Sequence, residues 1–337
     1  METAFDVAGL IGYRYRADDY YEVGREKIRE YARAVQAYHP AHWTESAAGE
    51  FGYSGLVAPA TFTSIVAMRT NRVLFEDVMT GYDTFLHTDQ VFEFHQPVVA
   101  GDRLTVDVEL SSVRRVAGRD LLTVTNTFTD LSGRIVQIMH TTLVGITSDD
   151  VDADISDAIE GVVMSGVDVA PLSPAPHAAD AAQTALSSQV SRTRVPHTAI
   201  RFDDIAAGDE LPPRTVQLTR GDLVNYAGVA GDANPIHWNE EVAALAGLPD
   251  VIAHGMLTMG LGAGFVTDWL GDPGAIVRYT ARLSNYTVVE AVSAGAVEFS
   301  GRIKSLDPET RTATVVLIAK SAGRKIFGLA TTEIRLA

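Results

Sequence analysis

Two stretches decide the fold of this 337-residue chain: YAGVAGDANPIHW at Tyr226–Trp238 and YARAVQAYHPAHW at Tyr31–Trp43. They lie 195 positions apart, and at that offset residues 21–62 align with residues 216–257 without a gap. Ten of the 42 aligned positions are identical, among them the proline, histidine and tryptophan that both stretches share. A gap-free match of this kind predicts a duplicated domain.

The length and composition agree with two folded domains. A chain of 337 residues suits two domains of about 150 residues each. Hydrophobic residues make up 46% and charged residues 21%, which excludes wholesale disorder. The 43 acidic residues outnumber the 27 basic ones, giving a formal net charge of −16 and a pI of about 4.9. This excess of negative charge argues against nucleic acid as a partner.

The absence of several features narrows the choice of compartment and chemistry. With no cysteine, the chain has no disulfide, no thiolate metal site and no cysteine nucleophile. The first residues are acidic and do not resemble a signal peptide. The longest uncharged stretch, Val251–Thr267, is too short for a membrane span. We therefore expect a cytoplasmic protein without a membrane span.

The clearest loss of pattern separates the two similar halves. It opens with an acidic run and continues through a proline-rich segment into alanine- and serine-rich sequence. Such a composition buries too little apolar surface to offset the entropy of ordering. We predict a first domain over residues 1–147, a linker over 148–194 with a short helix near 178–186, and a second domain over 195–337.

Both halves show the same order of elements. A helix starts at a capping signal, clearest at Thr219 and Asp222, and a second helix starts near Ala60 or His254. Strands with alternating apolar residues follow at 104–110, 122–128, 297–303, 313–319 and 326–336. An α+β fold, with an antiparallel sheet wrapped around a long helix, satisfies this pattern.

The second half carries a candidate catalytic loop. Gly231 and Pro235 bracket a tight turn that brings Asp232, Asn234 and His237 into a common space. A carboxylate beside an imidazole can hold one water and move its protons at neutral pH. The structural alternative also fits these residues, because aspartate and asparagine are common in turns and caps.

The start of the second helix in this half gives the loop a chemical partner. Gly255 lies between His254 and Met256 at the expected first turn of that helix. Its backbone N–H points out of a helix N-terminus, where developing negative charge is favoured. The pattern predicts an oxyanion site for an acyl thioester carbonyl. Carboxylate, imidazole and oxyanion donor together can remove or add a proton next to that carbonyl.

These motifs resemble those of the MaoC-like family of R-specific hydratases and dehydratases, which has the hotdog fold. The first half, with Tyr13–Tyr15, Val23–Lys27 and Val57–Phe62, is similar to the dehydratase domain found beside it. Together the halves resemble a fused HadA/HadB-type (3R)-hydroxyacyl-acyl-carrier-protein dehydratase. The resemblance implies a double hotdog: two tandem hotdog domains, HadA-like and then MaoC-like, that form a pseudo-dimer.

The resemblance also implies an activity. The chain is expected to be a lyase of the EC 4.2.1 type, a hydro-lyase that reversibly dehydrates (3R)-3-hydroxyacyl thioesters to trans-2-enoyl thioesters in type II fatty acid biosynthesis. The implied site consists of Asp232, His237 and Asn234 as catalytic residues, the Gly255 N–H as oxyanion donor, and His254 and Met256 as substrate-binding residues. No metal and no organic cofactor is implied. Two alternatives stay open: an R-specific enoyl-CoA hydratase of fatty acid degradation or polyester supply, and a non-catalytic acyl-binding protein.

The two halves differ at the residues that carry chemistry. Ala37 stands where the second half has its aspartate, and Ala60 where it has its glycine, while His42 keeps the imidazole. We therefore expect the first half to be non-catalytic, although a second site built on His39 and His42 stays open. The expected partner is an acyl-carrier-protein or CoA thioester. A homodimer and contact with other fatty acid synthase components both stay open.

Overall fold

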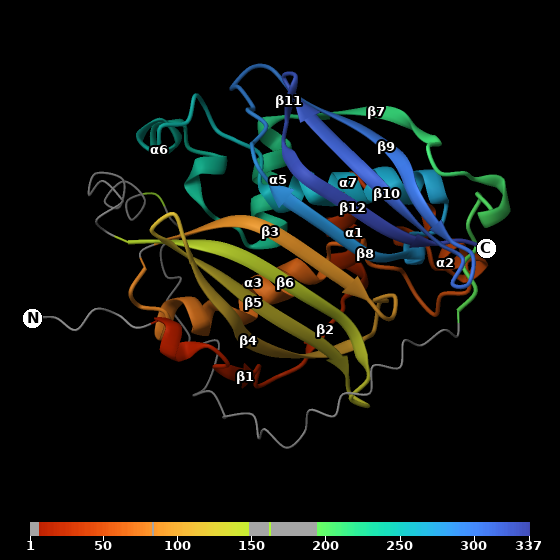
Figure 1. Ribbon diagram of the computed structural model, residues 1–337, viewed down its shortest axis with the longest axis horizontal. Helices are drawn as coiled ribbons and strands as arrows, with labels where there is room; N and C mark the ends of the chain where they lie inside the picture. Colours follow the sequence, from red (N-terminus) through yellow and green to blue (C-terminus); the bar gives the residue numbers. More distant parts are fainter. Residues whose placement is uncertain (1–6, 83, 148–161, 163–193) are drawn as a thin grey trace, which may run out of the picture.

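A continuous antiparallel sheet runs through both halves of the molecule, with helices packed against it (Figure 1). The computed structural model describes residues 7–82, 84–147, 162 and 194–337. The first half contains β1 (Arg14–Arg16), β2 (Tyr21–Glu22), α1 (Arg25–Ala34), η2 (Pro40–His42), α2 (Glu45–Glu50), α3 (Thr63–Thr70), β3 (Thr84–Phe94), β4 (Arg103–Val116), β5 (Arg119–Asp130) and β6 (Ile135–Ile146). The second contains β7 (Glu210–Leu218), α5 (Arg220–Ala230), η7 (Pro235–His237), α6 (Glu240–Leu245), α7 (Gly255–Leu270), β8 (Ile276–Leu283), β9 (Gly295–Asp307), β10 (Thr312–Ser321), β11 (Arg324–Lys325) and β12 (Phe327–Arg335).

The two halves join through strands β3 and β8. The sheet order is β1-β4-β5-β6-β3-β8-β12-β10-β9-β7, so β3 is the last strand of the first half and β8 the first strand of the second. These strands pair antiparallel, with Val91 opposite Thr280. The five strands predicted from alternation coincide with β4, β5, β9, β10 and β12.

The internal repeat extends from the sequence to local structure. Helices α1 and α5, η2 and η7, and α2 and α6 all begin at positions that differ by 195 residues. Even an ion pair is repeated: Arg25 lies 3.6 Å from Glu45, and Arg220 lies 3.0 Å from Glu240. The predicted capping box of α5 is confirmed, since the Thr219 side chain accepts from the Asp222 N–H and the Asp222 carboxylate accepts from the Thr219 N–H.

The central helices of the two halves differ in length. Helix α7 has 16 residues and begins directly after its N-cap, His254, so the predicted start near His254 is confirmed. In the first half α3 begins at Thr63 rather than near Ala60, has only eight residues, and is followed by a π-helical segment at Val73–Val78. Between them Asn71 is buried and exchanges amide hydrogen bonds with Asn126 of β5. The polar residues around Asn71 thus divide what the sequence pattern suggested was one apolar helix.

Helix α7 packs closely against the first half. A Cβ atom at Gly260 would lie 2.6 Å from Val35 Cγ1, so only glycine permits this approach. The short helix expected near residues 178–186 lies outside the described residues. No helix in the described part of the chain is long and apolar enough to cross a membrane.

Candidate active site

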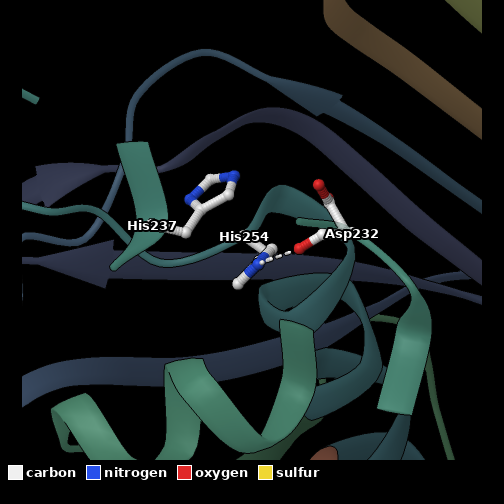
Figure 2. A group of neighbouring side chains, drawn as sticks. All are labelled: Asp232, His237 and His254. Atoms are coloured by element: carbon white, nitrogen blue, oxygen red, sulfur yellow. Dashed lines mark hydrogen bonds between the residues drawn. The ribbon is translucent and has the colours of Figure 1, made fainter. Parts of the chain in front are cut away.

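The loop after α5 and the start of α7 meet at one place. Gly231 ends α5 with a φ of 77°, a conformation that favours glycine, and the chain then turns into the loop that carries Asp232 and His237. The potential ligand atoms of Asp232, His237 and His254 lie within 4.8 Å of one another. Figure 2 shows the three side chains gathered at this meeting point.

His237 is held as a neutral base. Its side chain is buried, and Nδ1–H donates to the Ile252 carbonyl at 2.7 Å. This hydrogen bond leaves the lone pair on Nε2. Burial lowers the pKa of His237, while the nearby Asp232 carboxylate and the Ile252 carbonyl oppose that shift. The imidazole is therefore uncharged at neutral pH and able to accept a proton on Nε2.

Asp232 and Asn234 shape the loop differently. An Asp232 carboxylate oxygen accepts from the Asn234 N–H at 3.3 Å, which fixes the carboxylate relative to the backbone. The Asn234 side chain accepts from the Ile236 N–H at 3.2 Å and caps η7. Asn234 is thus engaged with its own loop through both its side chain and its backbone N–H.

His254 lies beneath the catalytic candidates. It is fully buried, and its ring stacks on that of His237 with centroids 3.8 Å apart and planes at 29°. Its Nε2–H donates to the Asp232 backbone carbonyl at 3.4 Å, the dashed line in Figure 2. Burial, together with the neighbouring His237, lowers the pKa of His254 to about 2. A permanently neutral ring therefore supports both His237 and the aspartate backbone.

Gly255 supplies the first backbone N–H of α7. An N–H at this position has no partner within its own helix. A Cβ atom at Gly255 would lie 2.6 Å from a methyl carbon of Leu283, so a larger residue would disturb the helix start. Met256, the next residue, is buried in the core, and its contact with an acyl chain stays a prediction.

Tyr226 is a further residue at this place that the motif analysis did not select. It is buried, with its ring centroid 4.8 Å from that of His254 and 6.3 Å from that of Tyr31. Tyr31 in turn donates to the Thr61 carbonyl at 3.0 Å. The sequence did contain a signal for Tyr226, because it is identical to Tyr31 in the internal repeat. In the structure these two tyrosines lie where the two halves touch.

The cluster also has the composition of a metal site. Asp232, His237 and His254 form such a group among the described residues. The two imidazole rings, however, stack face to face, with centroids 3.8 Å apart and planes at 29°. Metal ligands converge on one point from different directions. The arrangement fits a water held between carboxylate and imidazole better than it fits an ion.

The first half repeats the scaffold without the acid. His42 is buried and its Nδ1–H donates to the Val57 carbonyl at 2.6 Å, and burial lowers the pKa of His42 to about 4. His39 uses both ring nitrogens: Nε2–H donates to the Gly271 carbonyl at 3.0 Å, and Nδ1 accepts from the Ala41 N–H at 3.3 Å. Since Ala37 replaces the aspartate, this copy has no carboxylate at that position.

A cavity lies beside Ala60, the first-half residue that aligns with Gly255 at the start of α7. Its volume is about 700 Å³, and Ala58, Pro59 and Ala60 line one side of it. His95, just after β3, and Arg278 of β8 are also among its lining residues. Neither Asp232 nor His237, the candidate acid–base pair of the second half, lines this cavity.

Comparisons with known proteins cover both halves. Residues 9–139 match the family model "FAS1-like, dehydratase domain region", and residues 205–318 match "MaoC like domain". A solved structure described as a MaoC-like dehydratase is 57% identical, covers 98% of this chain and 100% of its own, and superposes with a TM-score of 0.92. A UPF0336 protein of Mycolicibacterium paratuberculosis is 41% identical over 147 residues, 43% of this chain and 84% of the relative.

A more distant structure bears on the fold alone. A Mycobacterium tuberculosis protein described as having a double hotdog fold is 15% identical and has a TM-score of 0.63. The match covers 97% of this chain and 96% of that one.

Proposed function

The chain belongs to the MaoC-like dehydratase family and has the double hotdog fold, and from this premise we propose that it is a (3R)-3-hydroxyacyl-thioester dehydratase of type II fatty acid elongation. The observation that carries the proposal is the cluster within 4.8 Å that joins the Asp232 carboxylate to the His237 imidazole at the start of α7. The proposed substrates are acyl-carrier-protein thioesters.

The proposed reaction moves one proton. His237 takes the C2 proton of the substrate on Nε2, while the Gly255 N–H stabilises the negative charge that develops on the thioester oxygen. The Asp232 carboxylate favours the resulting imidazolium, since it raises the pKa of His237 against the lowering caused by burial. The imidazolium then protonates the departing hydroxyl, which leaves as water. The reverse assignment, with Asp232 acting at C2, uses the same atoms.

The remaining site residues take supporting roles in this proposal. Asn234 keeps the loop in shape, as its contact with the Ile236 N–H suggests. His254 is fully buried, which favours a positioning role over direct contact with substrate. Met256 contacts the acyl chain. No step requires a metal or an organic cofactor.

The proposal assigns different tasks to the two halves. Residues 195–337 form the catalytic domain, residues 1–147 form a non-catalytic partner domain, and residues 148–194 link them. The absence of a carboxylate at Ala37 supports this division. The two family models match inside the proposed domains, which is consistent with these boundaries.

An R-specific enoyl-CoA hydratase is the second candidate, because it uses the same residues in the opposite direction. Turnover of one trans-2-enoyl chain attached to CoA and to acyl-carrier protein distinguishes the two. A preference for the carrier protein supports elongation. A clear preference for CoA with short chains would contradict it and favour the hydratase.

A further inference from the structure

A bulge in β3 turns one histidine of the first half toward the inner face of the sheet. Opposite β6, His87 pairs with Leu143 and Asp89 pairs with Thr142, so one residue between them is unmatched. An extra residue of this kind reverses the alternation of side chains along a strand. His87 therefore shares a face with the buried Leu143, whereas regular alternation from Asp89 would have turned it outward.

This part of β3 lies close to the start of α7. The pairing of Asp89 with Arg282 places His87 beside the end of β8, the neighbouring strand in Figure 1. Leu283 is the last residue of β8, and its side chain packs against the backbone of Gly255. His87 thus approaches the oxyanion end of α7 from the opposite half of the molecule.

Two further observations connect His87 with the catalytic cluster. Burial lowers the pKa of His87, and the Asp232 carboxylate is near enough to counter that shift in part. His87 Nε2 is buried and has no hydrogen-bond partner among the described residues. Buried polar atoms are nearly always paired, so an orphaned one beside a reactive site indicates a missing ligand or water.

We propose that His87 is a substrate-binding residue of the second half's active site, supplied across the interface by the first half. Its Nε2 hydrogen-bonds a polar group at the thioester end of the acyl substrate. This inference rests on the proposed function, which it deepens: the site becomes complete only when both halves are present. An uncharged imidazole suits this task, since it can pair with a hydroxyl or an amide without opposing the negative charge that develops during the reaction.

The test uses the full-length chain with crotonyl-CoA and two substitutions at one position. His87→Leu fills the space without a hydrogen-bonding group, and kcat/KM should fall about tenfold, the scale of one lost hydrogen bond. His87→Gln keeps a side-chain amide in reach, and kcat/KM should stay within about threefold of the wild type. Thermal unfolding of both variants is measured alongside, because a purely structural role would lower the melting temperature together with the rate.

His95, the residue that follows β3, provides the matched control. Its Nε2 is also buried without a partner among the described residues, and burial likewise lowers its pKa. It lies eight positions after His87, about 26 Å along an extended chain. His95→Leu should leave kcat/KM unchanged.

The outcomes separate this inference from the proposed function. Wild-type turnover that is lost in Asp232→Asn but unchanged in His87→Leu overturns the inference alone, as does an equal loss in the Leu and Gln variants. Absence of wild-type turnover with the crotonyl group on both CoA and acyl-carrier protein overturns both. If His87→Leu does not fold, nitrogen NMR of the histidine side chains in Asp232→Asn decides: crotonyl-CoA should shift the His87 Nε2 resonance, and an unchanged resonance contradicts the contact.

Discussion

The internal repeat gives His237 a matched control in the same molecule. His237 and His42 are 7% and 1% exposed, and their Nδ1 atoms donate to backbone carbonyls at 2.7 Å and 2.6 Å. Replacement by asparagine keeps an amide N–H near the position of Nδ1 but removes Nε2. Because the two environments are so similar, we expect both variants to lose a comparable free energy of unfolding, roughly 1–3 kcal/mol.

The catalytic effects of the two substitutions should differ sharply. His237→Asn removes the base and should lower kcat/KM about 10²- to 10⁴-fold. This loss corresponds to roughly 3–5 kcal/mol of transition-state stabilisation. His42→Asn should change kcat/KM less than about threefold, because Ala37 stands where the second half has Asp232 and His42 has no proposed catalytic role.

The assay is steady-state hydration of crotonyl-CoA, with thermal unfolding of each variant measured alongside. Equal melting temperatures with unequal rates support the assignment of catalysis to the second half. If folded His42→Asn loses as much activity as His237→Asn, the first half takes part in catalysis and the reasoning is refuted.

Three further predictions follow from the same contacts. The lowered pKa of His237 places the acid limb of the plot of kcat/KM against pH below pH 6.5, because the neutral base is lost only as pH falls through that pKa. An acid limb centred above pH 6.5 would contradict this prediction. Gly255→Ala should lower kcat/KM about 10- to 100-fold by displacing the N–H, and an added Leu283→Ala should restore part of the rate; no restoration would argue against steric displacement. Asp272→Asn should lower the free energy of unfolding by roughly 3–5 kcal/mol in urea, because the buried carboxylate pairs with Arg194; a change below about 1 kcal/mol would contradict it. Burial of Asp272 opposes its charged form, but the Tyr53 hydroxyl, the His197 N–H and Arg194 outweigh this effect and lower the pKa of Asp272. The stability that the Asp272 carboxylate contributes is therefore full above its unfolded pKa of about 3.9. It is lost as pH falls through the lower pKa of the folded state.

Five of the longer strands, β4, β5, β9, β10 and β12, were predicted from their alternation, whereas β3, β6, β7 and β8 were not. β4 and β10 alternate regularly because one face meets the core and the other meets solvent. β7 was missed because it contains Pro212 and Pro213, which a strand tolerates only at an edge or a bulge. The structure places β7 at the edge of the sheet, with a register shift between Leu211 and Arg214.

The candidate site was also predictable only in part from the sequence. Asp232, His237 and Gly255 were predictable together because one loop and one helix start carry them. The stacking of His254 on His237 depends on three-dimensional packing that spacing alone does not encode. The position of His87 depends on the β3–β8 pairing and a single-residue bulge, and no local pattern in the sequence determines either.

The most direct test of the central claim is the hydration rate of crotonyl-CoA with the wild type and with Asp232→Asn. Asparagine retains an oxygen that can accept from the Asn234 N–H, so the loop and the melting temperature should be preserved. The account predicts turnover by the wild type and a rate at least about 100-fold lower in the variant. Equal rates in the two proteins would contradict it, as would a folded wild type that hydrates no enoyl thioester on either CoA or acyl-carrier protein.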